Sequence, residues 1–312
     1  MSARSFTALG TASQAPTRYR AHNSYALRWD DQLVLFDPGE GTQRQCILAG
    51  VSIARATAVC VTHFHGDHSL GLPGVIQRRA LDNRSGSHEP VPLPVVYPGD
   101  GQPYFDRLRS ATVFHDTSEI VPTPVTGDGE VLRLGPATTV TARALDHRIT
   151  TFGYRLDEDD AVRFDPAALA RAGVRGPDVG RLAAEGRITT EAGTVTLEEV
   201  STVRRGQSMA FVMDTRRCEG ALALADGVDL LVCESTFLQA EHELADRYHH
   251  LTALEAGRLA AEAGARRLVL THFSARYDDT GAFAAEAGLV HDDVVALDDF
   301  DTVEVPLRPA AG

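Results

Sequence analysis

The stretch VTHFHGDHSLGLPG, residues 61 to 74, packs four metal-capable side chains into six positions: His63, His65, Asp67 and His68. In a short loop after a strand, side chains two residues apart can point the same way, so His63 and His65 can share one metal ion. Asp67 and His68 then turn toward a second. Imidazole nitrogen and carboxylate oxygen suit Zn²⁺, and Mn²⁺ and Fe²⁺ also accept them. A loop of solvated histidines would not gather four such residues, so the stretch predicts a metal site.

Four ligands cannot saturate two metal ions, so the hypothesis requires further ligands from elsewhere in the chain. Three candidates stand directly after, or at the end of, an apolar strand-like run: His147 in TARALDH, Asp214 in SMAFVMD and His272 in RLVLTH. Functional residues collect where strands end at one edge of an α/β sheet. The repeated placement therefore predicts that all three reach the site formed by residues 63 to 68.

Short β-rich runs that end at turn residues recur along the chain, with helical patterns between several of them. The strand-like runs are YALRW, QLVLFD, ATAVCVTH, PLPVVYP, TVTARALDH, SMAFVMD, DLLVCE and RLVLTH. The helical patterns are GLPGVIQRRAL, CEGALALADG and TALEAGRLAAEAG, the last with a capping box from Thr252 to Glu255 and a closing Gly264. This alternation predicts an α/β layered fold. A length of 312 residues allows one large or two small domains.

Residues 157 to about 206 interrupt this pattern. They are rich in glycine, proline and charge, with only a short helical candidate near DPAALARAG and a strand-like TVTLEEV. From the residues alone, the segment is either a disordered insertion or an arm that projects from the globular body.

The formal net charge of -13 arises in two places. Residues 278 to 304 carry nine acidic side chains and no basic one, and residues 157 to 160 carry four more. The rest of the chain is balanced, so the acidity does not exclude a nucleic-acid partner, whose binding depends on basic side chains. All 30 basic residues are arginines, which we attribute to genome base composition, although guanidinium groups also suit phosphates.

The sequence is typical of a cytoplasmic protein without a membrane partner. No run approaches the roughly 18 apolar residues of a membrane helix, and MSARSFTALG lacks the layout of a signal peptide. The cysteines show no CxxC pairing, which predicts buried reduced thiols at Cys46, Cys60, Cys218 and Cys233.

The segment from Thr62 to His68 reads T-H-x-H-x-D-H, and through it the chain resembles the metallo-β-lactamase fold superfamily. The resemblance implies a four-layered αββα sandwich over residues 1–312, here with an inserted, projecting arm at 157–206. It also implies two divalent metal ions per chain, Zn²⁺ or alternatively Mn²⁺. Such a pair generates hydroxide at neutral pH and stabilises both oxygens of an in-line displacement, which suits hydrolysis. These residues leave open whether the bond is a lactam, thioester, lactone or phosphodiester.

The same resemblance assigns the ligands. It implies that one ion is held by His63, His65 and His147, that the other is held by Asp67, His68 and His272, and that both are bridged by Asp214. Asp37 in LFDPGEG resembles an early aspartate that supports the metal loop without being a ligand.

Further stretches, over nearly the whole chain, resemble the ribonuclease Z family, endonucleases that remove 3′ trailers from precursor tRNA. They are LGTASQAPTRYRAHNS, LFDPGEGTQRQ, HFHGDHSLGLPG, FGYRL after His147, DTR at 214 to 216, and THFSARY at 271 to 277. FGYRL and the S-x-R-Y after His272 are the more specific of these. Two stretches depart from the family pattern. Its Lys-x-Arg-Asn reads Arg18, Tyr19, Arg20, Ala21, and its His-Glu-Ala-Thr reads Cys233, Glu234, Ser235, Thr236.

The family resemblance implies roles for three further groups. Glu234 pairs with a histidine of a His-x-Thr motif, for which HHLTALEAG offers His250 rather than His249. A histidine held by a carboxylate is a suitable general acid for an alkoxide leaving group. Asp67 is the expected general base as well as a ligand, and Arg276 of the S-x-R-Y stretch is expected to bind substrate. The products would be a tRNA with a 3′-hydroxyl and a trailer with a 5′-phosphate.

Residues 157–206 match the position of the family's arm, an exosite that clamps the tRNA elbow. The arm contains a Gly-Pro element, here Gly176 and Pro177, and its arginines are Arg163, Arg171, Arg175, Arg181 and Arg187, followed by Arg204 and Arg205. Their spacing suits phosphates contacted by shape, without base reading. In the family the arm of one subunit serves the active site of the other, so the resemblance implies a homodimer with precursor tRNA as substrate.

The leading hypothesis is a metal-dependent endoribonuclease acting on precursor tRNA, and two alternatives stay open. One is another phosphodiesterase, or an arylsulfatase-like hydrolase of small esters, on the same fold. An enzyme of this kind has no need of an arginine-bearing arm. The other is a non-catalytic RNA-binding or scaffold protein, which would be expected to lose ligands, whereas all seven positions are filled here.

Overall fold

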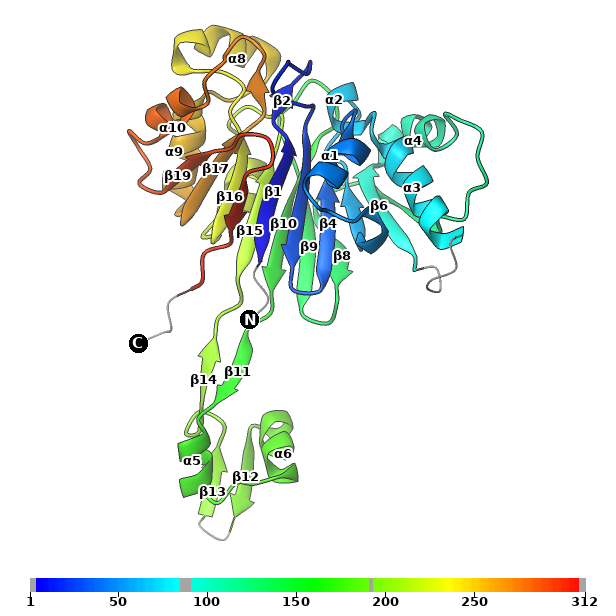
Figure 1. Ribbon diagram of the computed structural model, residues 1–312. Coiled ribbons are helices and arrows are strands. Elements are labelled where there is room, and N and C mark those ends of the chain that lie inside the picture. The colour runs from blue at the N-terminus through cyan, green and yellow to red at the C-terminus, as the bar shows by residue number, and fades with distance from the viewer. Residues whose placement is uncertain (1–3, 85–90, 191–192, 309–312) are drawn as a thin grey trace. The chain divides into compact units, whose positions relative to one another are not determined.

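The computed structural model describes residues 4–84, 91–190 and 193–308, and its strands form chiefly two seven-stranded sheets (Figure 1). The first sheet has the order β20 (Thr302–Glu304), β1 (Ser5–Gly10), β3 (Ser24–Trp29), β4 (Gln32–Phe36), β5 (Ala58–Cys60), β6 (Leu93–Pro98) and β7 (Ile120–Val125). The second has the order β19 (Val294–Ala296), β17 (Arg267–Thr271), β16 (Leu230–Glu234), β15 (Ser208–Val212), β10 (Phe152–Glu158), β9 (Thr138–Ala144) and β8 (Gly129–Leu134). A short parallel pair joins β2 (Ala12–Ser13) to β18 (Phe273–Ser274).

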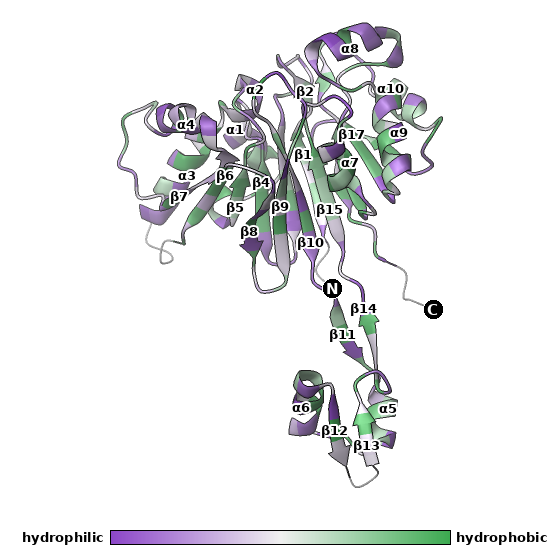
Figure 2. Ribbon diagram, turned by 180° about the vertical axis from the view of Figure 1, so that it is seen from behind, coloured by the Kyte–Doolittle hydropathy of each residue, from purple (hydrophilic) through white to green (hydrophobic). Residues whose placement is uncertain are grey.

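The two sheets pack face to face through alternate residues of their strands. On β3 the side chains of Tyr25 and Leu27 belong to this inner core, whereas Ala26 faces the other side. The ring of Phe211, on β15, lies 4.5 Å from the ring of Phe36 and 5.3 Å from that of Tyr25. Because the outer faces are also covered, the central strands are apolar on both sides, and Figure 2 shows apolar residues gathered on the strands.

Helices cover the outer face of each sheet. The helices packed on the first sheet are α1 (Thr42–Leu48), α3 (Leu72–Arg84) and α4 (Gln102–Arg109), with the 3₁₀ turns η1 (Ile53–Arg55) and η2 (Gly99–Gly101). Those packed on the second are α7 (Glu219–Ala225), α9 (Ala253–Ala263) and α10 (Gly281–Ala287). The short helices α2 (Gly66–Ser69) and α8 (His242–Tyr248) and the turn η3 (Gln239–Glu241) lie in the connections. The predicted αββα layering is thereby confirmed.

The strand and helix predictions agree with this arrangement. The eight strand-like runs lie on β3, β4, β5, β6, β9, β15, β16 and β17, and the three helical patterns on α3, α7 and α9. The Thr252 hydroxyl accepts a hydrogen bond from the Glu255 backbone N–H, the Thr252 N–H donates to the Glu255 carboxylate, and Gly264 ends α9 with a φ of 66°.

The direction of the strands determines where functional residues can meet. Strands β4 to β7 are parallel in the first sheet, and β15, β16, β17 and β19 are parallel in the second. The carboxyl ends of parallel neighbours lie at the same edge, so the segments after β4, β5, β15 and β17 are brought together within their sheets. These segments contain all the candidate ligands except His147, which follows β9.

The chain forms two compact units, and the second, mainly Glu158–Gln207, has a small core of its own. We call residues 158–207 the inserted unit. Its elements are β11 (Ala161–Phe164), α5 (Pro166–Arg171), α6 (Pro177–Glu185), β12 (Arg187–Thr190), β13 (Gly193–Thr196) and β14 (Ser201–Arg204). Its hydrophobic core consists of Ala168, Val174, Leu182, Ile188, Val195 and Val200. The alternative of a disordered insertion is therefore wrong.

The sequence gives a weak signal for this unit because its core residues are few and spread over many short elements. Helix α6 has no counterpart among the predicted elements, and the strand expected in TVTLEEV ends at Thr196.

All four cysteines are free, as predicted, and Cys46, Cys60 and Cys233 are buried, but Cys218 is only half-buried. No helix within the described ranges has the length and apolar character needed to span a bilayer.

Candidate metal centre and active site

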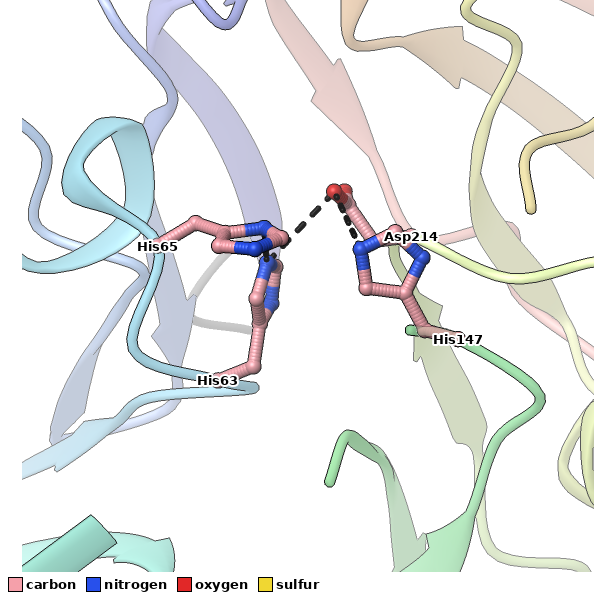
Figure 3. Close-up of side chains that lie close together, drawn as sticks. All are labelled: His63, His65, His147 and Asp214. Atoms are coloured by element: carbon pink, nitrogen blue, oxygen red, sulfur yellow. Dashed lines mark hydrogen bonds and ion pairs between the residues drawn. The ribbon is translucent and has the colours of Figure 1, made fainter. Parts of the chain in front are cut away.

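Three histidines and an aspartate converge from three separate segments, as Figure 3 shows. His63 and His65 lie in the loop after β5, His147 follows β9, and Asp214 follows β15. One nitrogen of each histidine and one oxygen of Asp214 lie within 4.8 Å of one another. The Asp214 Oδ2 atom is 3.5 Å from His63 Nε2 and 3.7 Å from His147 Nε2, and His63 Nε2 is 2.9 Å from His65 Nδ1. These distances are close to the roughly 3.3 Å that separates ligands around a tetrahedral zinc ion.

A second group lies beside the first and shares Asp214. It consists of Asp67, His68 and His272, with ligand atoms again within 4.8 Å. Asp214 Oδ1 is 3.3 Å from His68 Nε2 and 3.0 Å from His272 Nε2. Because Oδ2 of the same carboxylate faces the first group, Asp214 lies between the two groups with one oxygen toward each. All seven residues singled out in the sequence are thus brought together.

The backbone at three strand ends adopts a conformation that is uncommon outside glycine. Asp37 and Asp214 have φ angles of 42° and His272 has 63°. Non-glycine residues in the left-handed region are concentrated at functional sites, where the surrounding structure holds them against their local cost. Here the left-handed turn comes directly after strands β4, β15 and β17, where the chain passes from the sheet into the site.

In His63, His68, His147 and His272, the ring nitrogen Nδ1 points away from the centre. A hydrogen bond to this nitrogen fixes the orientation of each ring. His68 Nδ1 lies 2.9 Å from Asp37 Oδ2, His147 Nδ1 lies 3.1 Å from the His249 carbonyl, and His272 Nδ1 lies 2.7 Å from Thr236 Oγ1. His63 Nδ1 lies 3.0 Å from Thr62 Oγ1, whose hydroxyl donates to Asp37. With Nδ1 engaged in these contacts, Nε2 is the ring atom that faces the centre in each of these histidines.

The electrostatics of the centre favour a cation. Burial lowers the pKa of His63, His65 and His147, so these rings are neutral and can act as ligands. Burial also lowers the pKa of His68, but Asp214, Asp67 and Asp37 outweigh it and raise that pKa well above its ordinary value. The carboxylates therefore create a field that stabilises positive charge at this point.

Three buried polar atoms among the described residues test whether a metal fits. His147 Nε2, His272 Nε2 and Asp214 Oδ1 are buried without a hydrogen-bond partner. An unpaired buried polar atom is costly, so these three atoms, one in the first ligand group and two in the second, require further partners. A divalent cation supplies one, and the nitrogen and oxygen donors match its chemistry.

His250 and Glu234 form a pair at the edge of the centre. Glu234, at the end of β16, is fully buried, and its Oε1 lies 2.9 Å from His250 Nδ1. Burial lowers the pKa of His250, but Glu234 and Asp214 outweigh it and raise this pKa to about 9. His250 is therefore protonated at neutral pH, as a proton donor must be.

Several groups in the site had no signal in the sequence. The hydroxyl of Thr236 contacts Glu234, His250 and His272 at 2.7, 3.2 and 2.7 Å. The backbone N–H of Gln14 donates to Asp67 Oδ2 at 2.7 Å. The stretch around Glu234 was singled out in the sequence, yet only the fold shows that Thr236 joins the carboxylate to two histidines.

The remaining predicted substrate residues lie in two places. Arg276 is exposed, its guanidinium 5.3 Å from the centre of the Phe237 ring, which in turn lies 6.1 Å from the His250 ring. Arg20 of the N-terminal loop donates to the carbonyls of Ser274 and Tyr277, which joins that loop to the S-x-R-Y stretch. Gly176 and Pro177 begin α6 in the inserted unit, and the exposed arginines of this unit are Arg163, Arg171, Arg175, Arg181, Arg187, Arg204 and Arg205.

Asp37 offers a test of the centre that does not touch a proposed ligand. Its carboxylate accepts from the Thr62 backbone at 2.7 Å, from the Thr62 hydroxyl at 2.8 Å and from His68. We expect Asp37→Asn to lower divalent-metal affinity by about 10- to 100-fold, because an amide cannot hold all three donors. Chelator competition measures this affinity, with the exposed Asp31→Asn as control. Unchanged affinity would contradict the supporting role of Asp37.

Comparison with known proteins agrees with this geometry. Residues 17–150 match the model of the metallo-beta-lactamase superfamily. The chain is 53% identical to a ribonuclease Z of Streptomyces avermitilis over 99% of this chain and 100% of that protein. It is 40% identical to one of Chlamydia trachomatis over 99% and 100%.

Solved structures agree on the fold. The short form of human tRNase Z superposes with a TM-score of 0.66 at 23% identity, covering 97% of this chain and 99% of that one. YhfI of Bacillus subtilis, a metallo-beta-lactamase fold protein, gives 0.68 at 19%, covering 96% and 98%. The full-length relatives confirm the hydrolase class predicted from the motifs, and the chain belongs to the ribonuclease Z family of the metallo-β-lactamase superfamily.

Proposed function

We propose that this protein hydrolyses the phosphodiester on the 3′ side of the tRNA in a precursor, releasing the trailer and leaving a 3′-hydroxyl on the tRNA. The observation that supports this most strongly is the His250–Glu234 pair, joined at 2.9 Å, beside two ligand groups that both contact Asp214. A ribose 3′-oxygen is a poor leaving group without a proton, so a buried, charge-supported histidine suits this bond. A precursor-tRNA substrate also implies a cytoplasmic enzyme.

The metal assignment follows the two ligand groups. We assign one divalent ion to His63, His65 and His147, a second to Asp67, His68 and His272, and Asp214 to both. Five histidines among seven ligands favour Zn²⁺ over Mn²⁺, which prefers oxygen. Bound there, the ions would supply Lewis-acid stabilisation of charge on the phosphoryl oxygens and lower the pKa of water.

Asp67 and His250 carry the two proton transfers in this proposal. Burial raises the pKa of Asp67, but His68 and His272 outweigh it and lower that pKa, so the carboxylate is ionised and can accept the proton of the attacking water. The Gln14 N–H orients this carboxylate. His250, whose ring is oriented by its contact with Glu234, donates a proton to the leaving 3′-oxygen of the tRNA. Arg276 is proposed to contact a phosphate, since it is exposed and lies over the Phe237 ring, which neighbours His250.

The inserted unit is proposed to hold the tRNA away from the bond that is cut. Residues 166 to 190 carry four arginines against two acidic residues, and all four are exposed: Arg171, Arg175, Arg181 and Arg187. Gly176 has a φ of 55°, which favours glycine, and nothing lies within 4 Å of the place a Cβ would occupy. Its backbone is thus open to close approach by a phosphate backbone. We further propose a homodimer in which this unit serves the active site of the partner.

The direct test is to incubate the purified protein with a trailer-bearing precursor tRNA and to map the cut. Cleavage directly after the last tRNA nucleotide with a 3′-hydroxyl product supports the proposal. Hydrolysis of bis-p-nitrophenyl phosphate with no cut in the precursor would retire it.

The pH dependence tests the proton donor. His250 must be protonated, so activity should be present below its pKa of about 9 and be lost as the pH rises through it. Glu234→Gln removes the charge that raises this pKa, so the alkaline limb of kcat/KM should move down by roughly 1–2 pH units.

The same Glu234→Gln protein should lose much less activity on bis-p-nitrophenyl phosphate, because p-nitrophenolate leaves without a proton. An alkaline limb at the same pH in both proteins would show that His250 is not the acid.

A further inference from the structure

A cleft of about 820 Å³ opens beside the candidate metal centre, with His65 and His147 in its lining. One wall comes from η2 and the start of α4, on the side of the first sheet, and the other from residues 144 to 151, which follow β9 of the second sheet. The Thr150 hydroxyl donates to Asp100 Oδ2 at 2.5 Å and ties the two walls together. The cleft is therefore a built feature that leads away from the centre.

Aromatic rings form much of one wall. Phe64 stands between His63 and His65 in the loop after β5, and its ring lies 5.8 Å from that of Tyr97 and 5.9 Å from that of Tyr104. Tyr104 is 53% exposed, and the Arg107 guanidinium lies 5.5 Å from its ring centre. A Cβ at Gly101 would lie 2.1 Å from Phe64 Cε2, so glycine at this position leaves room for the Phe64 ring. The wall presents an open aromatic surface next to two proposed ligands.

We infer that this cleft binds the base of the first trailer nucleotide by stacking on Tyr104 and Phe64, an inference that rests on the proposed function. Unpaired bases stack on aromatic side chains irrespective of sequence, because every base has a π-face. Arg148, also in the lining, supplies positive charge for the phosphate that follows. The cleft thus binds the base of a trailer nucleotide whatever its identity.

The position of His250 indicates that the cleft binds the trailer and not the tRNA. This residue is assigned to protonate the 3′-oxygen of the last tRNA nucleotide, so that nucleotide belongs beside it. His250 lines a separate, charged pocket with Arg216 and Asp246, and it is not among the described residues that line the aromatic cleft. The first trailer nucleotide, on the other side of the scissile phosphate, therefore belongs in the cleft beside His65 and His147.

The test compares an intact precursor tRNA with one that is abasic at the first trailer position, in the wild-type protein, Tyr104→Ala and Tyr104→Phe. Removing the base should lower kcat/KM about tenfold in the wild type. Tyr104→Ala should lower kcat/KM for the intact precursor by a similar factor. The ratio of kcat/KM for the intact precursor to kcat/KM for the abasic precursor should then be close to one. Tyr104→Phe keeps the aromatic ring and should keep the wild-type ratio. Val113→Ala, at another exposed apolar residue, serves as control.

Each other outcome has a definite reading. If Tyr104→Ala lowers kcat/KM equally for both substrates, the cleft does not bind this base, although the proposed tRNA cleavage is unaffected. If the ratio changes only for a precursor abasic at the last tRNA nucleotide, the cleft belongs to the tRNA side and the inference is wrong. If the wild-type protein does not cut the intact precursor, the proposed function fails and the inference with it.

Discussion

Replacing Asp67 by alanine is expected to lower kcat/KM for precursor-tRNA cleavage by at least about 10³-fold, which makes it the most damaging single substitution in the site. Asp67 Oδ2 lies 3.4 Å from His68 Nε2 and 3.7 Å from His272 Nε2, and it accepts a hydrogen bond from Gln14. One carboxylate thus serves as a ligand and as the acceptor of the water proton, and alanine removes both functions. Single-turnover cleavage together with metal analysis measures the two losses.

Asp67→Asn separates the two functions. The amide oxygen keeps an acceptor for Gln14 and a weaker ligand, but it cannot take up a proton. We expect this variant, loaded with two metal ions under replete conditions, to remain roughly 100-fold or more below the wild type. Asp31→Ala, at an exposed aspartate, should change neither activity nor metal content. Near-normal cleavage by fully loaded Asp67→Asn would mean that another group accepts the proton.

Removing the body of the inserted unit should separate tRNA cleavage from hydrolysis of a small ester. Phe164 and Ser201 are paired directly across β11 and β14, so residues 165–200 can be replaced by an Asn-Gly turn that closes the remaining hairpin. We expect kcat/KM for precursor tRNA to fall about 100-fold, because several arginine–phosphate contacts are lost. Hydrolysis of bis-p-nitrophenyl phosphate should stay within about twofold, because the ligands are outside the deleted segment.

A charge variant checks that the loss comes from phosphate contacts. In the full chain, alanine at Arg171, Arg175, Arg181 and Arg187 should weaken tRNA binding and lower the slope of log affinity against log salt by roughly one per lost contact. Alanine at the exposed Arg78 and the half-buried Arg109, both in the main unit, is the control. If the deletion lowers hydrolysis of both substrates equally, the inserted unit is structural.

Local patterns in the sequence were sufficient for the α/β class and for the positions of the candidate ligands, whereas the αββα layering was implied by the family resemblance. A strand buried on both faces needs a continuous apolar run, as in SMAFVMD and RLVLTH, and such runs stand out in the sequence. The residue after each run then lies at the end of a strand, which is why His272 and Asp214 could be selected although they are far from His63 in the chain. The inserted unit lacked this signal because each of its short elements contributes few residues to its core.

The sequence by itself determined which side chains have the chemistry to hold metal ions and to transfer protons, because residue type and position after an apolar run are local properties. Only the tertiary structure decided which atoms face one another. The Gln14 N–H, the His249 carbonyl and the Thr236 hydroxyl are groups that almost any sequence supplies, and they acquire roles here because distant segments place them within 2.7 to 3.1 Å of Asp67, His147 and His272. The aromatic cleft likewise exists only where segments from both sheets meet, and no periodicity along the chain encodes that meeting.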